Sequence, residues 1–380
     1  MRFSCRFVLA LVSALAILAG FSTAASAADT IKVGLIVPMT GPIAEIGLLQ
    51  TEGAKLGIEK INAAGGVLGK KLELVIEDDQ ATNPGMVLAF SKLINQGDLV
   101  AVVASLRSTQ MNAISEDSKK AGLPVFFGGT DPTLTTTGNP WFFRTRPSDA
   151  YSAKVIADYG VNSLKKKKWA VIHSTDAFGT NGSKALIAAL KEFGVEPVVV
   201  QSINNGQTDL TPVVLAVRQS GADIISSYVA YETDVGLLAR QFKQFGVTAP
   251  WVGSPSVSTT TARNLAGPAL YDTYSVADFS ADANPEAKAF SEEFNKKLGR
   301  VADYTSGWPY DSVMLLAAAI KAANSTAPDK IRAALLALKD FRGTEGVYNY
   351  DKNGEGLRGY NIVQNKAGKI VFDRTIMFDK

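Results

Sequence analysis

The chain is almost without cysteine and histidine, and this scarcity excludes several kinds of chemistry. Its 380 residues include one cysteine, Cys5, and one histidine, His173. A disulfide framework or a zinc site built from the usual ligands would need more of these residues. Thiol chemistry is not expected either, because Cys5 lies in the N-terminal segment that is interpreted below as a cleaved leader. His173 lies at the end of a predicted strand and in no recognisable catalytic or metal-binding motif, so the sequence predicts neither a metal site nor a histidine-based catalytic triad. We expect an apolar core alone to hold the fold together.

Excess charge and long apolar runs are also scarce. The formal net charge is +3, so nothing predicts binding to nucleic acid. The one basic cluster, Lys165–Lys168, is expected at the solvated end of a helix. The long apolar run, residues 7–21, follows two arginines and precedes Ala25-Ser26-Ala27, which is typical of a secretory signal with an A-x-A cleavage site. The run is short for a membrane span. We expect cleavage before Ala28, the alternative being an uncleaved anchor.

Through most of the remaining chain, apolar segments of strand length alternate with helical patterns. The predicted strands are residues 31–38, 71–78, 99–105, 168–174, 196–203, 222–229 and 249–255. The predicted helices are residues 46–63, 84–95, 109–121, 177–193, 210–220 and 233–245. Strands rich in Val, Ile and Leu that alternate with helices indicate parallel sheets. Since the series restarts after residues 141–149, we predict two doubly wound lobes, followed by helices at 285–298, 307–323 and 329–338 and by short strands.

One glycine-rich segment, INAAGGVLGKKLELVIEDDQ at residues 61–80, looks at first like a phosphate-binding loop. The spacing from Gly65 to Gly69 is one residue too short for that motif, and Lys71 stands where Ser or Thr is needed. With GLIVPMTGPIAEIG, GGTDPTLT and GWPYDSVMLLAAAI, the segment instead resembles the leucine/isoleucine/valine-binding proteins. These are type I periplasmic solute-binding proteins of ABC transporters. In that setting Gly65 and Gly66 end a helix, and Gly69 turns the chain into a strand.

The resemblance covers essentially the whole chain after the leader and implies its architecture. It implies an α/β protein with two doubly wound lobes of the type I periplasmic binding protein fold, joined by a three-strand hinge. We place the signal peptide at residues 1–27, lobe 1 at 28–146 plus 277–345, and lobe 2 at 147–276 plus 346–380. The implied protein is a periplasmic monomer without metal or cofactor, which closes on a small carboxylate and delivers it to a membrane permease.

Two other classes of protein remain as alternatives. A ligand-sensing protein on the same lobes would be indicated by a fused membrane or DNA-binding segment, and none is recognisable. An enzyme would need a nucleophile, a base and an orienting group, and no motif here unites them. We therefore expect a binding protein and not an enzyme.

Ligands of doubly wound sheets lie at the carboxyl ends of the strands, in the loops that enter helices. In one such loop Ser108 and Thr109 begin a predicted helix, and Arg107 beside them could hold a carboxylate through two hydrogen bonds. The alternative is that Ser108 only caps the helix and Arg107 is solvated. Two other features are expected to be structural: Asp78-Asp79 as a strand-end cap or hinge contact, and Trp308 as part of the core.

Carried over position by position, the resemblance adds five residues to the candidate site. Gly128 and Thr130 match the backbone and hydroxyl contacts that the family makes to the ligand carboxylate. Phe178 falls where the family often has an aromatic ring over the ligand. Tyr231 falls on the tyrosine near the ligand ammonium, and Ile46 would line the side-chain pocket.

Two departures from the family pattern bear on the ligand. The acid that meets the ammonium is expected within Gly253–Val257, which contains no acid, and a family serine is replaced by Leu106 or Arg107. A buried ammonium without a carboxylate partner is costly, so these changes predict an aromatic or α-keto acid. The alternative is a branched-chain or other hydrophobic amino acid. The acids that could then meet its ammonium from neighbouring loops are Asp131, Glu232 and Asp278.

Overall fold

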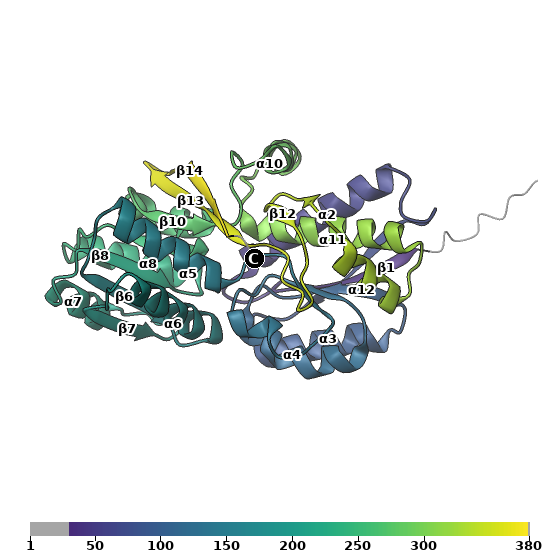
Figure 1. The fold of residues 1–380 in the computed structure, drawn as a ribbon, viewed down its shortest axis with the longest axis horizontal. Coiled ribbons are helices and arrows are strands. Elements are labelled where there is room, and N and C mark those ends of the chain that lie inside the picture. The colour runs from purple at the N-terminus through teal and green to yellow at the C-terminus, as the bar shows by residue number, and fades with distance from the viewer. Residues whose placement is uncertain (1–29, 379–380) are drawn as a thin grey trace, which may run out of the picture.

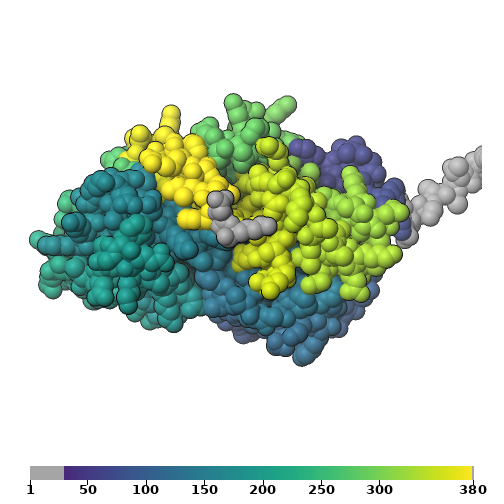
Figure 2. Space-filling view, in the orientation of Figure 1, coloured from purple at the N-terminus to yellow at the C-terminus, as the bar shows by residue number. Residues whose placement is uncertain are grey.

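The computed structural model describes residues 30–378, which form two α/β lobes side by side (Figure 1). In the space-filling view the lobes meet along a narrow junction, and the last strands, in yellow, lie beside its upper end (Figure 2). The predicted leader, residues 1–27, and its cleavage site lie outside the described residues. Among the helices of the described part, none has the length and apolar character needed to cross a membrane.

The first lobe contains a five-stranded parallel sheet with the strand order β2-β1-β3-β4-β5. Its strands are β1 (Ile31–Val37), β2 (Leu72–Asp78), β3 (Leu99–Val103), β4 (Val125–Phe127) and β5 (Phe142–Arg144). Neighbouring strand residues face opposite sides, so Leu35 and Phe126 pack in one core and Ile36 and Phe127 in the other. One face is covered by α2 (Ala44–Ala63), α10 (Pro285–Leu298), α11 (Tyr304–Ala323) and α12 (Pro328–Ala337). The other face is covered by α3 (Asn83–Asn95) and α4 (Ser108–Ala121).

The second lobe contains a three-stranded parallel sheet of order β7-β6-β8, which a bridge between Ile225 and Trp251 links to a four-stranded mixed sheet of order β9-β10-β13-β14. The strands are β6 (Trp169–Ser174), β7 (Val199–Ile203), β8 (Ile224–Tyr228), β9 (Val252–Gly253), β10 (Tyr274–Ala277), β13 (Gly359–Lys366) and β14 (Lys369–Met377). One face packs on α5 (Asp149–Asp158) and α6 (Ala177–Glu192). The other packs on α7 (Thr211–Gln219), α8 (Glu232–Gln244) and α9 (Thr260–Ala266).

The chain passes between the lobes three times. The first two crossovers are residues 145–148 after β5 and residues 278–284 after β10. The sequence places the third crossover after residue 345, but the hairpin of β11 (Phe341–Arg342) and β12 (Val347–Tyr348) and the loop after it pack on the first lobe. Tyr348, Tyr350 and Leu357 belong to that lobe's core. We therefore place the third crossover near residue 358, because apolar side chains anchor the preceding segment in the first lobe.

The glycine-rich segment that resembles a phosphate loop is a structural connection, as predicted. After α2 ends, the N–H of Gly65 donates to the carbonyl oxygen of Asn62 at 3.1 Å, and the N–H of Gly66 donates to that of Ile61 at 3.0 Å. This pair of bonds is the Schellman motif, and it requires positive φ at Gly65, where φ is +95°. At Gly66 there is also no room for a side chain, since a Cβ would lie 2.1 Å from the carbonyl oxygen of Lys70.

Candidate ligand-binding site

A small cavity lies between the lobes, where the loops after the parallel strands meet. The lining residues from the first lobe and first crossover are Leu106, Arg107, Ser108, Thr109, Thr130, Arg146 and Tyr304, and those from the second lobe are Asp176, Phe178, Ala230, Pro255 and Ser256. Its volume is about 30 Å³, whereas pockets that enclose small molecules usually measure roughly 300–1,000 Å³. The cavity therefore admits a ligand only if the lobes separate or the side chains that fill it move.

The N-terminus of α4, in the first lobe, lies at this cavity. The N–H of Arg107 donates to Ser105 Oγ at 2.9 Å and holds the loop between β3 and α4. Arg107 is the N-cap residue with an extended backbone, and no side chain caps the helix. Ser108 Oγ instead accepts from the N–H of Asp131 at 3.2 Å, so the alternative that Ser108 caps the helix is wrong. The N–H groups of a first helical turn have no acceptor within the helix and favour an anion.

The Arg107 side chain spans the cleft. Its Nη1 donates to the carbonyl oxygen of Ala230, and its Nη2 lies 3.2 Å from Glu232 Oε2. The guanidinium also lies 5.0 Å from the ring centre of Tyr231. Because this side chain is 13% exposed, the alternative of a solvated Arg107 is wrong. Burial is the largest single influence and opposes the charge, but the carboxylate of Glu232, together with Tyr304, Tyr231 and Asp176, outweighs burial, and the pKa of Arg107 is raised.

Glu232 is the acid that sequence reasoning named only as an alternative. It begins α8, is 1% exposed, and accepts from Tyr304 Oη at 3.3 Å in addition to its contact with Arg107. Tyr304 in turn lies under the guanidinium of Arg146, 4.0 Å from the ring centre. The cleft therefore contains a buried carboxylate held between a cation of the opposite lobe and a phenol.

The two other acids named as alternatives have different surroundings. Asp131 Oδ2 accepts from Asn181 Nδ2 of the second lobe at 2.8 Å, which is a further contact between the lobes. Asp278 is paired with Arg146 at the hinge. Glu232 is therefore the one of the three acids in contact with Arg107.

Three more predicted site residues lie in or beside the cavity. Thr130 lines it, and its Oγ1 donates to Asp149 Oδ2 at 2.7 Å. Burial raises the pKa of Asp149 to about 6, although the Thr130 hydroxyl lowers it in part. Phe178 lines the cavity on the second lobe, and Thr109 both lines it and accepts from the N–H of Ala177 across the junction at 3.2 Å. Direct contact of these residues with a ligand stays a prediction.

Gly128 and Ile46 lie outside the set of residues that line the cavity. The N–H of Gly128 donates to the carbonyl oxygen of Ser105 at 3.1 Å, so this amide is already used within the first lobe. Ile46 is 1% exposed and packs in the core of the first lobe. Trp308 belongs to the same core, as expected. Ile46 is therefore a core residue in this structure, whereas Gly128 lies behind the cavity, where its carbonyl oxygen accepts from Arg146.

The aspartate pair at the end of β2 is structural, as expected. Asp78 Oδ1 accepts from the N–H groups of Met39 and Gln80 at 2.9 and 2.8 Å. Asp79 is fully buried, and burial raises its pKa to about 6. Within residues 30–378, no cluster of three or more His, Cys, Asp and Glu side chains is arranged to hold a metal ion.

The two lobes and the cleft between them define the class of protein. Residues 30–369 match the family described as periplasmic binding protein, and the chain belongs to this family. Within it, the chain is of the branched-chain amino acid type, a substrate-binding protein of ABC transporters and not an enzyme.

The chain is similar to two curated proteins over nearly all of its length. One is a leucine-, isoleucine-, valine-, threonine-, and alanine-binding protein of Pseudomonas aeruginosa, 30% identical over 91% of this chain and 92% of the relative. The other is a Leu/Ile/Val-binding protein homolog of Brucella melitensis, 31% identical over 96% and 99%.

Solved structures have the same fold. The substrate-binding protein LivJ of Streptococcus pneumoniae in complex with isoleucine has a TM-score of 0.84 at 25% identity, over 92% of this chain and 99% of that one. A solute-binding protein of R. palustris in complex with benzoate has a TM-score of 0.82 at 20% identity, over 90% and 95%. The predicted family and fold are confirmed.

Proposed function

We propose that this chain captures one small carboxylate between its lobes in the periplasm and delivers it to the membrane permease of an ABC transporter. It is exported by a cleaved signal peptide and acts as a monomer. The observation that carries the proposal is the meeting, in one cavity, of the α4 N-terminus, Arg107 and Thr130 with side chains of the second lobe. Closure of the lobes would remove water from the ligand and strengthen each polar contact to it.

Several donors in the first lobe suit a carboxylate. The N–H groups of the first turn of α4 lie on one side of the cavity. The Thr130 hydroxyl lies there too, but it donates to Asp149 in this structure and would have to turn toward the ligand. Arg107 Nε is buried and has no acceptor among the described residues, so this donor remains for a ligand oxygen. A guanidinium that gives Nε and one Nη to a carboxylate forms the bidentate pair that arginine favours.

The position of Glu232 favours an amino acid over an acid without an amino group. If the ligand carboxylate binds Arg107, Glu232 loses the guanidinium that pairs with it, although the Glu232 side chain is still only 1% exposed. Leaving one member of a buried pair alone costs about 3–5 kcal/mol. A ligand ammonium removes this cost, because it replaces the guanidinium beside Glu232. The geometry therefore supports best a zwitterionic amino acid with an apolar side chain, and the relatives named above point the same way.

An aromatic or α-keto acid is the second candidate, and it corresponds to the preference drawn from the sequence alone. Two observations favour it: Gly253–Val257 contains no acid, and two guanidiniums, of Arg107 and Arg146, line the cavity with the ring of Phe178. An acid without an amino group would require the Arg107 guanidinium to bind the ligand carboxylate and Glu232 at the same time. A solute-binding protein with the same fold has been solved in complex with benzoate.

Matched ligand pairs in a thermal-shift assay test the proposal. The pairs are leucine with 4-methyl-2-oxopentanoate, and phenylalanine with phenylpyruvate. A ligand that binds only the folded protein adds about 2.7 kcal/mol to its stability at a hundredfold excess over Kd. We expect stabilisation by the amino acids alone. Stabilisation by the deaminated acids alone would establish the second candidate, and none by any small carboxylate would refute the proposed site.

Small-angle scattering tests the closing of the lobes separately. If ligand bridges the two lobes, the radius of gyration should decrease when the stabilising compound is added, since the open population is depleted. An unchanged radius with a compound that clearly stabilises the protein would refute closure while leaving the binding function intact.

A further inference from the structure

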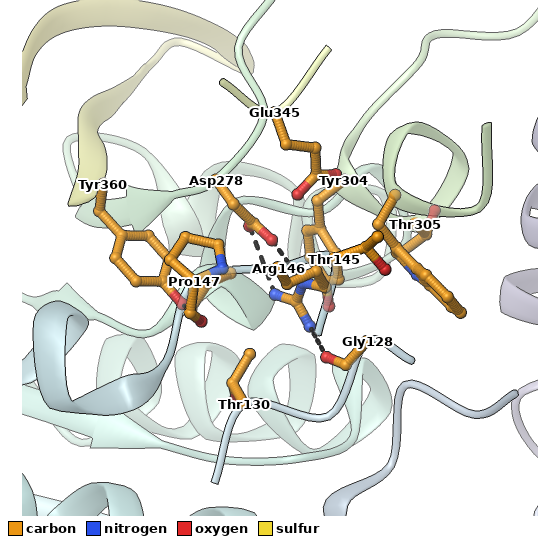
Figure 3. Close-up of polar contacts among 12 residues, drawn as sticks. Gly128, Thr130, Thr145, Arg146, Pro147, Asp278, Tyr304, Thr305, Glu345 and Tyr360 are labelled. Atoms are coloured by element: carbon orange, nitrogen blue, oxygen red, sulfur yellow. Dashed lines mark hydrogen bonds and ion pairs between the residues drawn. The ribbon is translucent and has the colours of Figure 1, made fainter. Parts of the chain in front are cut away.

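Three ionisable side chains from separate segments meet at the hinge (Figure 3). Arg146 lies on the first crossover, Asp278 on the second, and Glu345 in the turn between β11 and β12. Arg146 Nε and Nη2 donate to the two carboxylate oxygens of Asp278, the latter at 3.3 Å, and Nη1 donates to the carbonyl oxygen of Gly128 at 3.1 Å. The side chains of Arg146 and Asp278 are 5% and 0% exposed, so this is a buried pair.

Glu345 is buried beside this pair without a donor of its own. It is 7% exposed, and among the described residues neither of its carboxyl oxygens has a hydrogen-bond partner. Figure 3 shows its side chain directed at Asp278, whose oxygens already accept from Arg146. If Glu345 were ionised, two carboxylates would share one guanidinium, and the cluster would carry one uncompensated negative charge away from water.

A proton on Glu345 removes both difficulties. The protonated carboxyl group is neutral, and its O–H can donate to Asp278. Burial raises the pKa of Glu345 well above its ordinary value, the charge of Asp278 raises it further, and Arg146 lowers it only in part. Asp311 of α11 also raises it, and accepts from the N–H of Glu345 at 3.0 Å.

A second cavity, of about 230 Å³, is lined in part by Asp278 and Glu345. Its ionisable lining residues besides Asp278 and Glu345 are Glu286, Arg342, Arg358 and Tyr360. Water and solvent protons therefore have a route to the pair once the surrounding segments move apart.

We propose that Glu345 and Asp278 form a proton-binding pair that holds the hinge in the conformation described here, and that loss of the proton to solvent favours the open cleft. Asp278 follows β10 of the second lobe, whereas Glu345 belongs to the first, so rotation of the lobes changes the separation of these two groups. Without the proton, two negative charges in contact repel each other, and opening relieves the repulsion by separating and hydrating them.

The hinge cluster also has a physical connection to the cleft. Arg146 lies over the ring of Tyr304, and the Tyr304 hydroxyl donates to Glu232, the cross-cleft partner of Arg107. A change in the position of Arg146 would therefore affect Tyr304 and, through it, the hydrogen bond that Tyr304 donates to Glu232. Protonation at the hinge and closure of the cleft are coupled through these packed groups.

Spin labels on the ligand-free protein measure the predicted pH dependence directly, whatever the ligand is. Cys5, in the predicted leader, is the only cysteine in the sequence, so Lys119→Cys on α4 and Lys191→Cys on α6 give two unique labels at exposed positions of opposite lobes. Distances between the labels are then recorded from pH 5 to pH 9. We expect the ratio of open to closed protein to rise with pH, by at most tenfold per pH unit for a single proton.

Glu345→Gln in the labelled protein isolates the group responsible. Glutamine cannot ionise but can still donate an N–H to Asp278, so this variant should stay closed across the pH range. Glu286→Gln is the matched control, because Glu286 is a partly exposed acid at the same cavity, and it should follow the parent. A parent whose distances do not change with pH overturns the proposal without any variant. An unaltered pH curve in Glu345→Gln assigns the transition to another group, such as Asp149 or Asp311, and also overturns it.

Discussion

The substitution Glu232→Gln is the most informative single change in the cleft, because it separates the two candidate ligand classes. Glutamine keeps the size of the side chain and one carbonyl oxygen but removes the negative charge. In the present structure that charge faces Arg107 Nη2 at 3.2 Å and Tyr304 Oη at 3.3 Å. If a ligand ammonium replaces Arg107 beside Glu232, the substitution removes the carboxylate that the ammonium needs.

The expected loss follows from the contact that disappears. Hydrogen bonds that involve a charged group contribute about 1.5–3 kcal/mol, and about 1.4 kcal/mol corresponds to a factor of ten in affinity. Leucine should therefore bind Glu232→Gln roughly 10 to 150 times more weakly than the parent protein. For 4-methyl-2-oxopentanoate we expect no loss or a gain, because Arg107 is then released from its partner and is free for the ligand carboxylate.

Calorimetric titration of both compounds into parent and variant measures this difference. Glu286→Gln, remote from the cleft, serves as the control for nonspecific effects of removing one negative charge, and circular dichroism checks that each variant is folded. An equal loss of affinity for leucine and its keto acid would show that Glu232 acts through Arg107 or the local fold, and would refute the reasoning that assigns it to the ammonium.

Three further results are expected. Thr130→Ala should weaken ligand binding by about 1–3 kcal/mol in calorimetry, because it removes the hydroxyl that would turn from Asp149 to the ligand carboxylate. Thr130→Ser should restore most of the affinity, and unchanged affinity in the alanine variant would mean that the site is misplaced. Gly66→Ala should destabilise the protein in urea unfolding far more than Gly65→Ala, since only at Gly66 would the new Cβ meet a backbone oxygen; equal effects would contradict this. Burial raises the pKa of Asp79 to about 6, so the folded state keeps a proton that the unfolded chain releases near pH 4. The free energy of unfolding should therefore fall by roughly 3 kcal/mol as pH rises from about 4 to 6. Asp79→Asn should remove that part of the slope, and an unaltered slope would show that Asp79 titrates normally.

The long elements of the fold were predictable from the sequence because each is long enough to show a period. The helix at residues 285–298 is found with the same bounds, and the one predicted at 109–121 begins one residue earlier. Strands β4 and β5 have three residues each, Val125–Phe127 and Phe142–Arg144, and no alternation can be read over such a length. Their place in the sheet depends on partners in other segments, since Val125 of β4 pairs with Val102 of β3, and Phe142 of β5 pairs with Val125.

The candidate site was less predictable, since its main contacts join residues far apart in the sequence. Glu232 and Asp234 lie in the first turn of a helix, where acids are common because they suit the helix dipole. That local preference gives no sign that Glu232 faces Arg107 across the cleft. The pairing of Arg146 with Asp278 likewise depends on two crossovers that meet in the fold, and neither residue lies in a sequence motif from which the pair could be predicted.

If the proposed site is correct, the contact between Arg107 and Glu232 would let the cleft discriminate between ligands. A ligand must separate these two side chains, or be shared by them, before it can use either one. A ligand with only a carboxylate leaves Glu232 buried and unpaired, and one with only an ammonium does the same to Arg107, at a cost of about 3–5 kcal/mol in each case. A zwitterion supplies a partner to both. Selectivity would then arise because a wrong ligand leaves either Arg107 or Glu232 buried without a partner. A polar site rejects analogues that lack one functional group in the same way.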